Sequence, residues 1–523
     1  MNEASDLTTA DLDVLVVGGG IIGAGAALDA VTRGLRVALV ESGDWGGGRS
    51  GHTSTLVHGG LVDLPRVGVR AVAALRRERD LLLDRIAPHL VRRVPLLVPL
   101  TGGLPERLAV GAGLTVYDAA AFSIRQPGVL PGHRQLPRRA VQRLAPSVAL
   151  TDVTGAVQLY EAQVDDARLT VTVVRTAAAY GALIVARAPA RRLLVDGGRV
   201  VGVELPGPGG SRQVRARVVV LAAGTATARL VPGGDRPPGP VSPTGPDTVH
   251  LIVPRSRIRS STGLALRTGD HALYVVPWGR HWIVGSTAAW SEADLLLADL
   301  SRRLVSPLTR EAVESSFATP APLGPDADRS PSIAVPIPGL VTVRGGGLAG
   351  YRADAEHAVD AAVAQIGGLH PASATERVPL LGADGFVARW NQRHLLAARA
   401  GVPVLRMEHL LQRYGSGVDT LIAAVEEWPT LAAPLAGAED YLAVEAWFAV
   451  AYEGATDLGD VLVRRTRIAM ETWDSGAEAA GAVAGLMAEQ LGWDDRERSR
   501  RISRYLAQAS ANRPAGWDAL PRT

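Results

Sequence analysis

The feature that most constrains the fold is a glycine-rich turn in the segment VLVVGGGIIGAG at Val14–Gly25. The apolar, β-branched run Leu12–Val17 is typical of a strand that a parallel sheet buries on both faces. Gly18, Gly20 and Gly23 then give the spacing G-x-G-x-x-G at the point where a helix is expected to begin. The pattern predicts the first strand, turn and helix of a dinucleotide-binding domain.

The residues after the turn complete this motif. A second expected strand, Arg36–Val40, ends in Glu41, about 20 residues after the glycines, where a carboxylate can accept hydrogen bonds from an adenosine ribose. Gly18 permits the tight turn, Gly20 lets a pyrophosphate reach backbone N–H groups, and Gly23 lets helix and strand pack closely. A glycine turn alone is a common loop, but the strand, helix, second strand and acid in this order indicate dinucleotide binding.

Composition excludes several classes of chemistry. The sequence has no cysteine and we find no lysine in it, so thiol catalysis, disulfides and lysine Schiff bases are excluded. The net charge is +3, without a basic stripe interleaved with aromatic residues, so nucleic acid is not an expected partner. No spacing typical of metal ligands is present. At 523 residues the chain is expected to fold as two or three domains.

The sequence carries no expected signal peptide or membrane span. The N-terminal residues lack a basic region followed by an apolar core, and no apolar run approaches the ~20 residues that a spanning helix needs. We therefore expect a cytoplasmic protein. The apolar segment 108–122 has two interpretations, a core helix or a peripheral contact with the inner face of a membrane.

The remaining pattern predicts alternating strands and helices, followed by helices alone. A glycine- and hydroxyl-rich segment at 42–60, the cofactor loop below, can wrap a cofactor. Strands are expected at 95–100, 183–186, 192–195, 199–205, 217–221, 248–253, 272–277, 282–285 and 340–343, and helices at 67–87, 112–122, 166–180 and 351–366. From residue 372 onward the expected structure is almost wholly helical.

Motifs along nearly the whole chain resemble the FAD-dependent glycerol-3-phosphate dehydrogenase family. After the opening motif these are HGGL at 58–61, VDDAR at 164–168, HLIVPRSR at 250–257, VVPWG at 275–279 and VGST at 284–287. In the C-terminal part they are RYGS at 413–416, GDVLVRRTR at 459–467 and LGWD at 491–494. The resemblance selects FAD over NAD as the cofactor.

The resemblance implies an α/β fold with three parts. A discontinuous Rossmann-like FAD-binding domain comprises 1–75, 150–235 and 336–370. An inserted substrate or cap domain with an antiparallel sheet comprises 76–149 and 236–335, and a C-terminal α-helical domain comprises 371–523. We expect the arginines and tryptophans of the last domain to serve packing and contacts in a homodimer.

The resemblance also implies a reaction and its residues. In the family, a hydride passes from carbon 2 of glycerol 3-phosphate to flavin N5 while a base takes the hydroxyl proton, and the electrons then pass to a quinone or another acceptor. The implied catalytic residues are His250, Arg329 and Arg352. The implied cofactor-binding residues are Gly18, Gly20, Gly23, Glu41, Ser50, Ser54, His58, Gly59, Gly60, Gly224, Gly346, Gly347 and Leu348.

Several pocket positions depart from the family pattern. Val62 and Asp63 stand where the family has Arg-Tyr, Ala321 stands in place of an arginine, and Gly347 stands in place of a lysine. Each lost charge-assisted phosphate contact is worth about 1.5–3 kcal/mol. The substrate is therefore expected to have diverged, and two alternatives stay open: flavin-dependent oxidation of a non-phosphorylated alcohol or an amine C–N bond, and a non-catalytic FAD-binding partner subunit.

Overall fold

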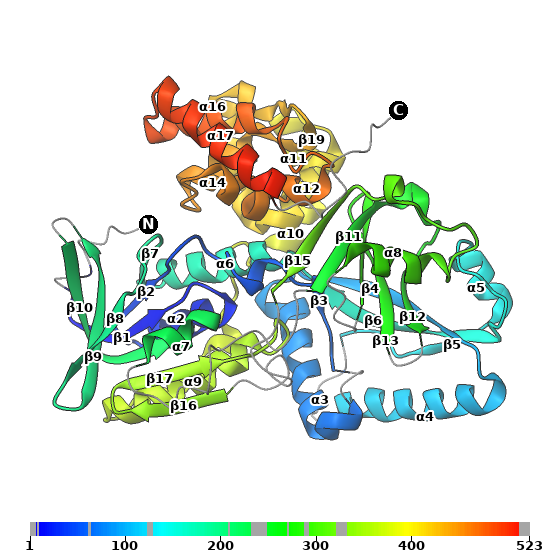
Figure 1. The fold of residues 1–523 in the computed structure, drawn as a ribbon, viewed down its shortest axis with the longest axis horizontal. Coiled ribbons are helices and arrows are strands. Elements are labelled where there is room, and N and C mark those ends of the chain that lie inside the picture. Colours follow the sequence, from blue (N-terminus) through cyan, green and yellow to red (C-terminus); the bar gives the residue numbers. More distant parts are fainter. Residues whose placement is uncertain are drawn as a thin grey trace.

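The computed structural model describes residues 7, 10–60, 64–122, 129–207, 210–231, 248–268, 271–286, 292–320 and 332–511. Two β-sheets lie side by side, and a helical C-terminal domain lies across them (Figure 1). The α/β class with a Rossmann-like sheet, an antiparallel cap sheet and C-terminal helices confirms the predicted fold class.

The first sheet, called the nucleotide sheet here, has eight strands. Its main path runs β16-β17-β10-β1-β2-β7, with β8 and β9 branching from β10. The strands are β1 (Leu12–Val17), β2 (Val37–Val40), β7 (Leu183–Val185), β8 (Arg192–Asp196), β9 (Arg199–Gly207), β10 (Gly210–Leu221), β16 (Ser332–Ile337) and β17 (Leu340–Arg344). Strands β17, β10, β1, β2 and β7 are parallel, and every residue of β1 is buried, as its apolar run predicts.

Helices cover one face of the nucleotide sheet and a β-meander covers the other. Helices α2 (Ile21–Thr32), α6 (Asp166–Ala179) and α9 (Tyr351–Ile366) share one apolar core with Val14 and Val16 of β1. Leu15 and Val17 point to the opposite face and pack with residues of β8, β9 and β10. Because both faces of the sheet are covered, every position of β1 is apolar or buried, and its sequence is nearly continuous in apolar residues.

The second sheet, called the cap sheet here, has nine strands in the order β15-β11-β14-β13-β12-β4-β6-β3, with β5 paired to β6. The strands are β3 (Leu56–Val57), β4 (Arg92–Leu100), β5 (Arg134–Pro137), β6 (Gly155–Gln163), β11 (Thr248–Pro254), β12 (Gly263–Thr268), β13 (His271–Trp278), β14 (His281–Ser286) and β15 (Ser315–Thr319). Pairing is antiparallel except between β12 and β4.

The sheets do not follow the predicted domain limits everywhere. Strand β6 falls in the range 150–235 predicted for the FAD-binding domain, yet it pairs with β4 over its whole length in the cap sheet. Strand β3 likewise pairs with β6. Long-range strand pairing decides these memberships, and the sequence pattern of one strand does not reveal its partner. The domain limits themselves stay a prediction.

The remaining helices flank the two sheets or form the C-terminal domain. Those before residue 371 are α3 (Leu64–Leu81), continued by the π-helical segment η3 (Leu82–Ile86), and α4 (Gly103–Phe122), α5 (Arg138–Leu144), α7 (Thr227–Leu230) and α8 (Ala293–Ser301). The later ones are α10 (Phe386–Asn391), α11 (Arg393–Ala400), α12 (Val404–Tyr414), α13 (Val418–Glu427), α14 (Ala443–Ala451), η10 (Asp460–Thr466, π-helical), α15 (Ile468–Glu471), α16 (Ala480–Leu491) and α17 (Asp495–Ala511). A short hairpin of β18 (Pro434–Leu435) and β19 (Ala438–Leu442) interrupts the helices that the sequence predicts there.

The apolar segment 108–122 lies within α4, at the outer end of the cap (Figure 1). Leu114 and Tyr117 are buried, whereas Leu108 is exposed. One face of the helix is therefore a core face. Within the residues that the structure describes, no helix is both long and apolar enough to cross a membrane.

Candidate functional site

The glycine turn after β1 has the geometry that its sequence predicts. Gly18 adopts φ 113°, a conformation that side-chain-bearing residues rarely take. A Cβ at Gly23 would lie 1.9 Å from the carbonyl oxygen of Gly18. Gly20 is the N-cap of α2 and provides no side-chain cap, which leaves the first turn of the helix suited to an anion. The turn therefore fits the pyrophosphate of a dinucleotide.

Two predicted cofactor residues contact this turn. Glu41, directly after β2, accepts hydrogen bonds from the backbone N–H groups of Gly19 (2.6 Å) and Gly43 (2.7 Å). The Ser50 hydroxyl accepts a hydrogen bond from Ile21 N–H at the start of α2 (3.0 Å). The carboxylate thus lies at the position that the dinucleotide motif requires, and its contact with a ribose stays a prediction.

Two further glycine loops meet the turn at the same sheet edge. Because β1, β10 and β17 are parallel, their carboxyl ends meet there, which is where open α/β sheets bind ligands. Gly224 (φ 55°) follows β10, and Gly346 (φ 94°) follows β17 and lies against Ile22 of α2. The loop after β17 also holds two further predicted cofactor residues, the half-buried Gly347 and Leu348.

A buried carboxyl group lies beside this last loop. A Cβ at Gly346 would lie 2.8 Å from the Asp354 carboxylate of α9. Burial, followed by the nearby Glu78, raises the pKa of Asp354 to about 7.

The His58-Gly59-Gly60 segment is held by a buried network that the sequence did not reveal. Gly59 N–H donates to Glu161 of β6 (3.0 Å), and Arg79 of α3 donates to the same carboxylate (2.9 Å). A Cβ at Gly59 would lie 2.2 Å from the Tyr117 hydroxyl, so no larger residue fits. Gly60 adopts φ 77°, and His58 is exposed. Only glycine fits at position 59, and the side chains that surround this segment come from α3, α4 and β6.

The predicted base, His250, lies on β11 of the cap sheet. Its ring is buried, stacks on Phe317 at 4.8 Å between ring centres, and places Nε2 2.7 Å from the Tyr274 hydroxyl. Its Nδ1 lies 3.4 Å from the Thr319 hydroxyl. Burial lowers the pKa of His250 to about 4, so the imidazole is neutral at neutral pH.

Neighbouring strands and the cofactor loop complete the surroundings of His250. Gly285 of β14 pairs with Tyr274 of β13, and a Cβ at Gly285 would lie 2.3 Å from the phenol oxygen. Glycine at this position therefore makes room for the phenol. The Thr319 hydroxyl also donates to the carbonyl oxygen of His52, and Ser54 is hydrogen-bonded to Tyr274. These contacts bring the predicted base and the cofactor loop together.

Arg352, the second predicted catalytic residue, is buried among carboxylates. Its Nε and Nη2 donate to both oxygens of Glu78 (2.7 and 2.6 Å), and Nη1 donates to Glu356 (2.7 Å) and Thr375 (3.1 Å). The guanidinium charge is thus balanced within the protein. A contact between Arg352 and a substrate phosphate stays a prediction.

The other predicted pocket positions, Val62, Asp63, Ala321 and Arg329, lie outside the described residues. Among the described residues, no group of acidic or histidine side chains has a geometry suited to a metal ion.

Comparison with known proteins defines the family. Residues 13–353 match the family model for FAD dependent oxidoreductases, and residues 373–498 match the model for the C-terminal domain of alpha-glycerophosphate oxidase. The chain is 38% identical to glycerol-3-phosphate dehydrogenase 2 of Mycobacterium tuberculosis over 97% of its own length and 89% of that protein. It is 30% identical to the mitochondrial enzyme SDP6 of Arabidopsis thaliana, over 94% of this chain and 85% of that protein.

The chain belongs to the FAD-dependent glycerol-3-phosphate dehydrogenase family. It is an FAD-dependent oxidoreductase, and this argues against a non-catalytic partner subunit. Its fold is similar to the crystal structure of glycerol-3-phosphate dehydrogenase from Bacillus halodurans complexed with FAD, with a TM-score of 0.76 and 24% identity over 99% of this chain and 98% of that one. The glycine turn and the loops at the sheet edge are the residues that would hold the FAD.

Four buried arginines, called the arginine cluster here, lie where the family's C-terminal domain meets the rest of the chain: Arg168 of α6, and Arg413, Arg465 and Arg467 of the C-terminal domain. Arg467 donates to Asp165 (2.9 Å), to Asp166 and to the carbonyl oxygen of Gly51 (2.9 Å). Arg465 donates to both carboxylate oxygens of Asp44, one at 2.7 Å. Asp44 and Gly51 both belong to the cofactor loop, so the C-terminal domain fixes this loop directly.

Three of the family motifs come together in this cluster. Arg413 of RYGS donates to Asp165 of VDDAR (3.0 Å) and to the carbonyl oxygen of Arg465 (2.6 Å) in GDVLVRRTR. Burial alone would raise the pKa of Asp165, but Arg467 and Arg413 lower it to about 2. These motifs therefore join domains, and neither the spacing nor the residue types indicated that role.

Proposed function

We propose that this enzyme oxidises a secondary alcohol group of a small substrate, with glycerol 3-phosphate as the first candidate. Support comes from the names of its relatives, which are glycerol-3-phosphate dehydrogenases over nearly the whole chain. The observation that carries the mechanism is the neutral, buried His250, linked through Thr319 to the cofactor loop.

In the proposed mechanism the protein positions the substrate and takes one proton. Bound FAD supplies the acceptor for the hydride. The neutral imidazole of His250 takes up the hydroxyl proton through Tyr274, whose hydroxyl lies 2.7 Å from Nε2: the phenol passes its own proton to Nε2 and takes the proton of the substrate hydroxyl. Burial keeps the ring unprotonated at neutral pH before this step. Tyr274 and Thr319 hold the ring from both nitrogens, and Phe317 stacks on its face.

A non-phosphorylated alcohol or an amine is the second candidate substrate. The observation that favours it is that Arg352 forms ion pairs with Glu78 and Glu356. A guanidinium that already binds two carboxylates is poorly available to bind a phosphate. The substitutions at Val62, Asp63, Ala321 and Gly347 have the same consequence for phosphate affinity.

The test is anaerobic mixing of the FAD-loaded enzyme with glycerol 3-phosphate, glycerol or glycine, followed by the flavin absorbance. Bleaching by glycerol 3-phosphate at the lowest concentration supports the first candidate. Bleaching by glycerol or glycine but not by glycerol 3-phosphate supports the second. If none of the three reduces the flavin, the proposed oxidation is wrong.

Arg352→Gln distinguishes the two roles of this arginine. If Arg352 only pairs with Glu78, the variant loses stability by about 3–5 kcal/mol and keeps the KM for the reducing substrate, because a buried ion pair has lost one partner. A rise in KM of more than tenfold, selective for the phosphorylated substrate, would instead assign Arg352 to phosphate binding. Urea unfolding and steady-state kinetics measure the two effects separately.

We also propose a homodimer in the cytoplasm that passes electrons from FAD to a quinone or another acceptor. The exposed Leu108 on α4 (63% exposed) supports a peripheral contact of this helix with the inner face of a membrane. Sedimentation of the enzyme with anionic vesicles, compared with Leu108→Ser, tests the membrane contact.

A further inference from the structure

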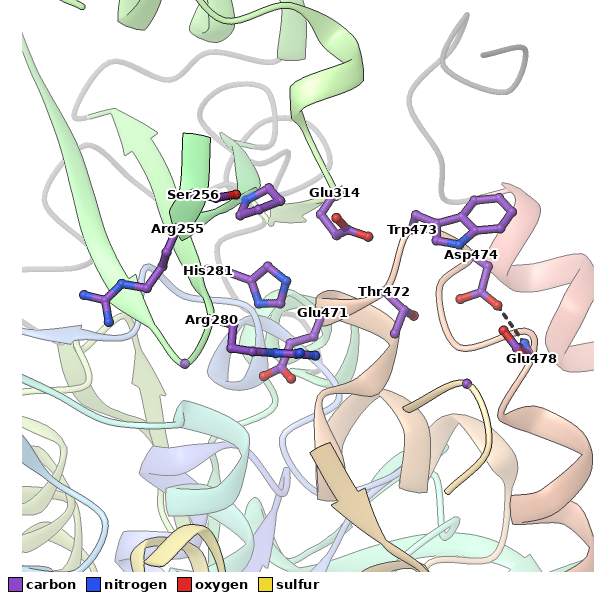
Figure 2. Close-up of a pocket in the computed structure, with 13 residues that line it drawn as sticks. Arg255, Ser256, Arg280, His281, Glu314, Glu471, Thr472, Trp473, Asp474 and Glu478 are labelled. Carbon is purple, nitrogen blue, oxygen red and sulfur yellow. Dashed lines mark hydrogen bonds between the residues drawn. The ribbon is translucent and has the colours of Figure 1, made fainter. Parts of the chain in front are cut away.

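A cavity of about 690 Å³ lies between the cap sheet and the C-terminal domain (Figure 2). The cap side of its lining comprises the end of β11, the β13–β14 turn, His281 and Glu314, and the C-terminal side comprises Gly437, residues 471–474 and Glu478. Its size is that of a small-molecule site. The flavin turn and His250 are not among its lining residues.

The cavity is separated from His250 by a layer of apolar side chains. Ile252, Trp278 and Ile283 form a buried cluster, with Phe317 and Met470 packed against it. Phe317 stacks on His250, whereas Trp278 donates through its indole N–H to Glu471 of the cavity wall (2.6 Å). A ligand in this cavity would therefore not occupy the substrate site.

Acidic side chains dominate the charge of the cavity. Glu314 lines it from the cap side, and Asp474 and Glu478 line it from the C-terminal side. Asp474 is held in place by the backbone N–H groups of Gly476 (3.0 Å) and Glu478 (2.7 Å). The excess of carboxyl groups in the lining favours a cationic ligand.

The lining also contains two arginines, Arg255 and Arg280. Arg280 pairs with Asp440 at 2.5 Å. The guanidinium of Arg255 lies 4.7 Å from the ring centre of Trp282. Arg255 keeps its positive charge in this arrangement, but the carboxyl groups of the lining outnumber the two guanidinium groups.

His281 is a second and independent indication of a ligand. Its side chain lines the cavity, is only 8% exposed, and makes no hydrogen bond to any residue that the structure describes. Figure 2 shows the imidazole with Glu314 and Glu471 on either side of it in the view. Burial lowers the pKa of His281, so a neutral ring nitrogen is available to accept a hydrogen bond from a ligand.

We propose that this cavity is a binding site for a small organic cation with an ammonium or guanidinium group. Glu314 and Glu478 supply the charge, and His281 accepts a hydrogen bond from the cation. The indole of Trp473, which is 56% exposed at the cavity wall, provides an aromatic face for the cationic group.

The test is isothermal titration calorimetry on the FAD-loaded full chain, with agmatine as the cationic probe and glutarate as an anionic control of similar length. We expect agmatine to bind at one site per chain and glutarate not to bind. The double variant Glu314→Gln with Glu478→Gln should weaken agmatine binding at least tenfold, and Trp473→Ala should weaken it as well. Glu427→Gln, a change at an exposed carboxylate of α13 outside the cavity, is the matched control and should bind like the native enzyme.

Three outcomes would overturn the proposal: no binding of agmatine, binding of glutarate as tight as that of agmatine, or agmatine binding that the double variant leaves unchanged. The glutamine substitutions keep side-chain size, and a normal flavin spectrum for the double variant shows that its fold is intact.

Discussion

Two regions of this enzyme fix the cofactor loop by opposite means. The arginine cluster holds it with the buried ion pair between Arg465 and Asp44 and with the hydrogen bond from Arg467 to the carbonyl oxygen of Gly51. On the cap sheet, His250 meets the same loop through neutral hydrogen bonds and remains uncharged. The difference separates two tasks: charged groups position the loop from the C-terminal domain, whereas uncharged hydrogen-bond partners hold the imidazole where a proton must be taken up.

The physical reason lies in what burial does to each kind of group. A buried carboxylate with two guanidinium partners remains ionised, whereas a buried imidazole without a carboxylate partner loses its proton. Asp165 and His250 show these two outcomes, with pKa values lowered to about 2 and about 4. Substitutions in the arginine cluster should therefore lower stability and FAD content, whereas substitutions around His250 should lower turnover.

The largest effect is expected for Arg467→Ala. The change leaves Asp165 and Asp166 buried without this partner, and it removes the hydrogen bond to Gly51 in the cofactor loop. Breaking a buried ion pair from one side costs about 3–5 kcal/mol, so we expect a large loss of stability and of bound FAD. Urea unfolding and the ratio of flavin to protein absorbance measure both. Arg498→Ala, which breaks an exposed pair with Asp495, is the control and should change stability by less than about 1 kcal/mol.

His250→Asn should fail in the opposite way, with FAD and stability largely kept and turnover lost. Removal of a general base lowers kcat by about 10²–10⁴. Stopped-flow flavin reduction, with whichever candidate substrate reduces the flavin in the anaerobic mixing test, measures the chemical step directly. Loss of FAD from His250→Asn, or reduction at the native rate, would contradict the role assigned to this residue.

As pH falls, the region around His250 should lose stability at a higher pH than the arginine cluster. Histidine has a pKa of 6.5 when unfolded and His250 about 4 when folded, so the unfolded chain binds more protons between these values and stability falls as pH falls. This difference amounts to about 3 kcal/mol across that window. His89, whose pKa burial lowers to about 3, adds to the same slope.

The arginine cluster responds only at lower pH. Asp165 has a lowered pKa of about 2 against 3.8 in the unfolded chain, so its contribution is present above about pH 4 and is lost below that. Urea unfolding at pH 7, 5.5, 4.5 and 3 checks the order, and between pH 7 and 4.5 His250→Asn should show a shallower decline than the native enzyme. An equal decline in both proteins would show that His250 does not carry the effect.

The sequence predicted the nucleotide half of the molecule well, because the signals there are local. A strand, a turn with two sterically required glycines and a terminal acid fall within 30 residues, and Gly18, Gly23 and Glu41 lie as expected. Helix 351–366 was also predicted to its exact limits, since its apolar spacing is regular. Such features depend on neighbours in sequence.

Features that depend on distant partners could not be predicted in this way. Thr319 contacts His250 because β15 pairs with β11, which carries His250, and Tyr274 reaches it because β13 pairs with β14, the other neighbour of β11. A one-residue shift in register would turn these side chains away. Arg352 lies at the helix start that the motif indicates, yet its charge is balanced by Glu78, which is 274 residues away in the chain. The motif located the guanidinium but not the group that it binds.

The smallest effect is expected at Thr319, where the cap sheet contacts the cofactor loop. Thr319→Val keeps the shape of the side chain but removes the hydroxyl that donates to His52 and lies beside His250. Loss of one such bond costs about 1 kcal/mol, because the His52 carbonyl is left without this donor. Thr115→Val removes an exposed hydroxyl that donates within α4, and it should change stability by less than about 0.5 kcal/mol. If Thr319 only supports the loop, urea unfolding will shift while the rate of flavin reduction stays within twofold; a larger fall in rate with unchanged stability would show that its hydroxyl positions the imidazole for proton uptake.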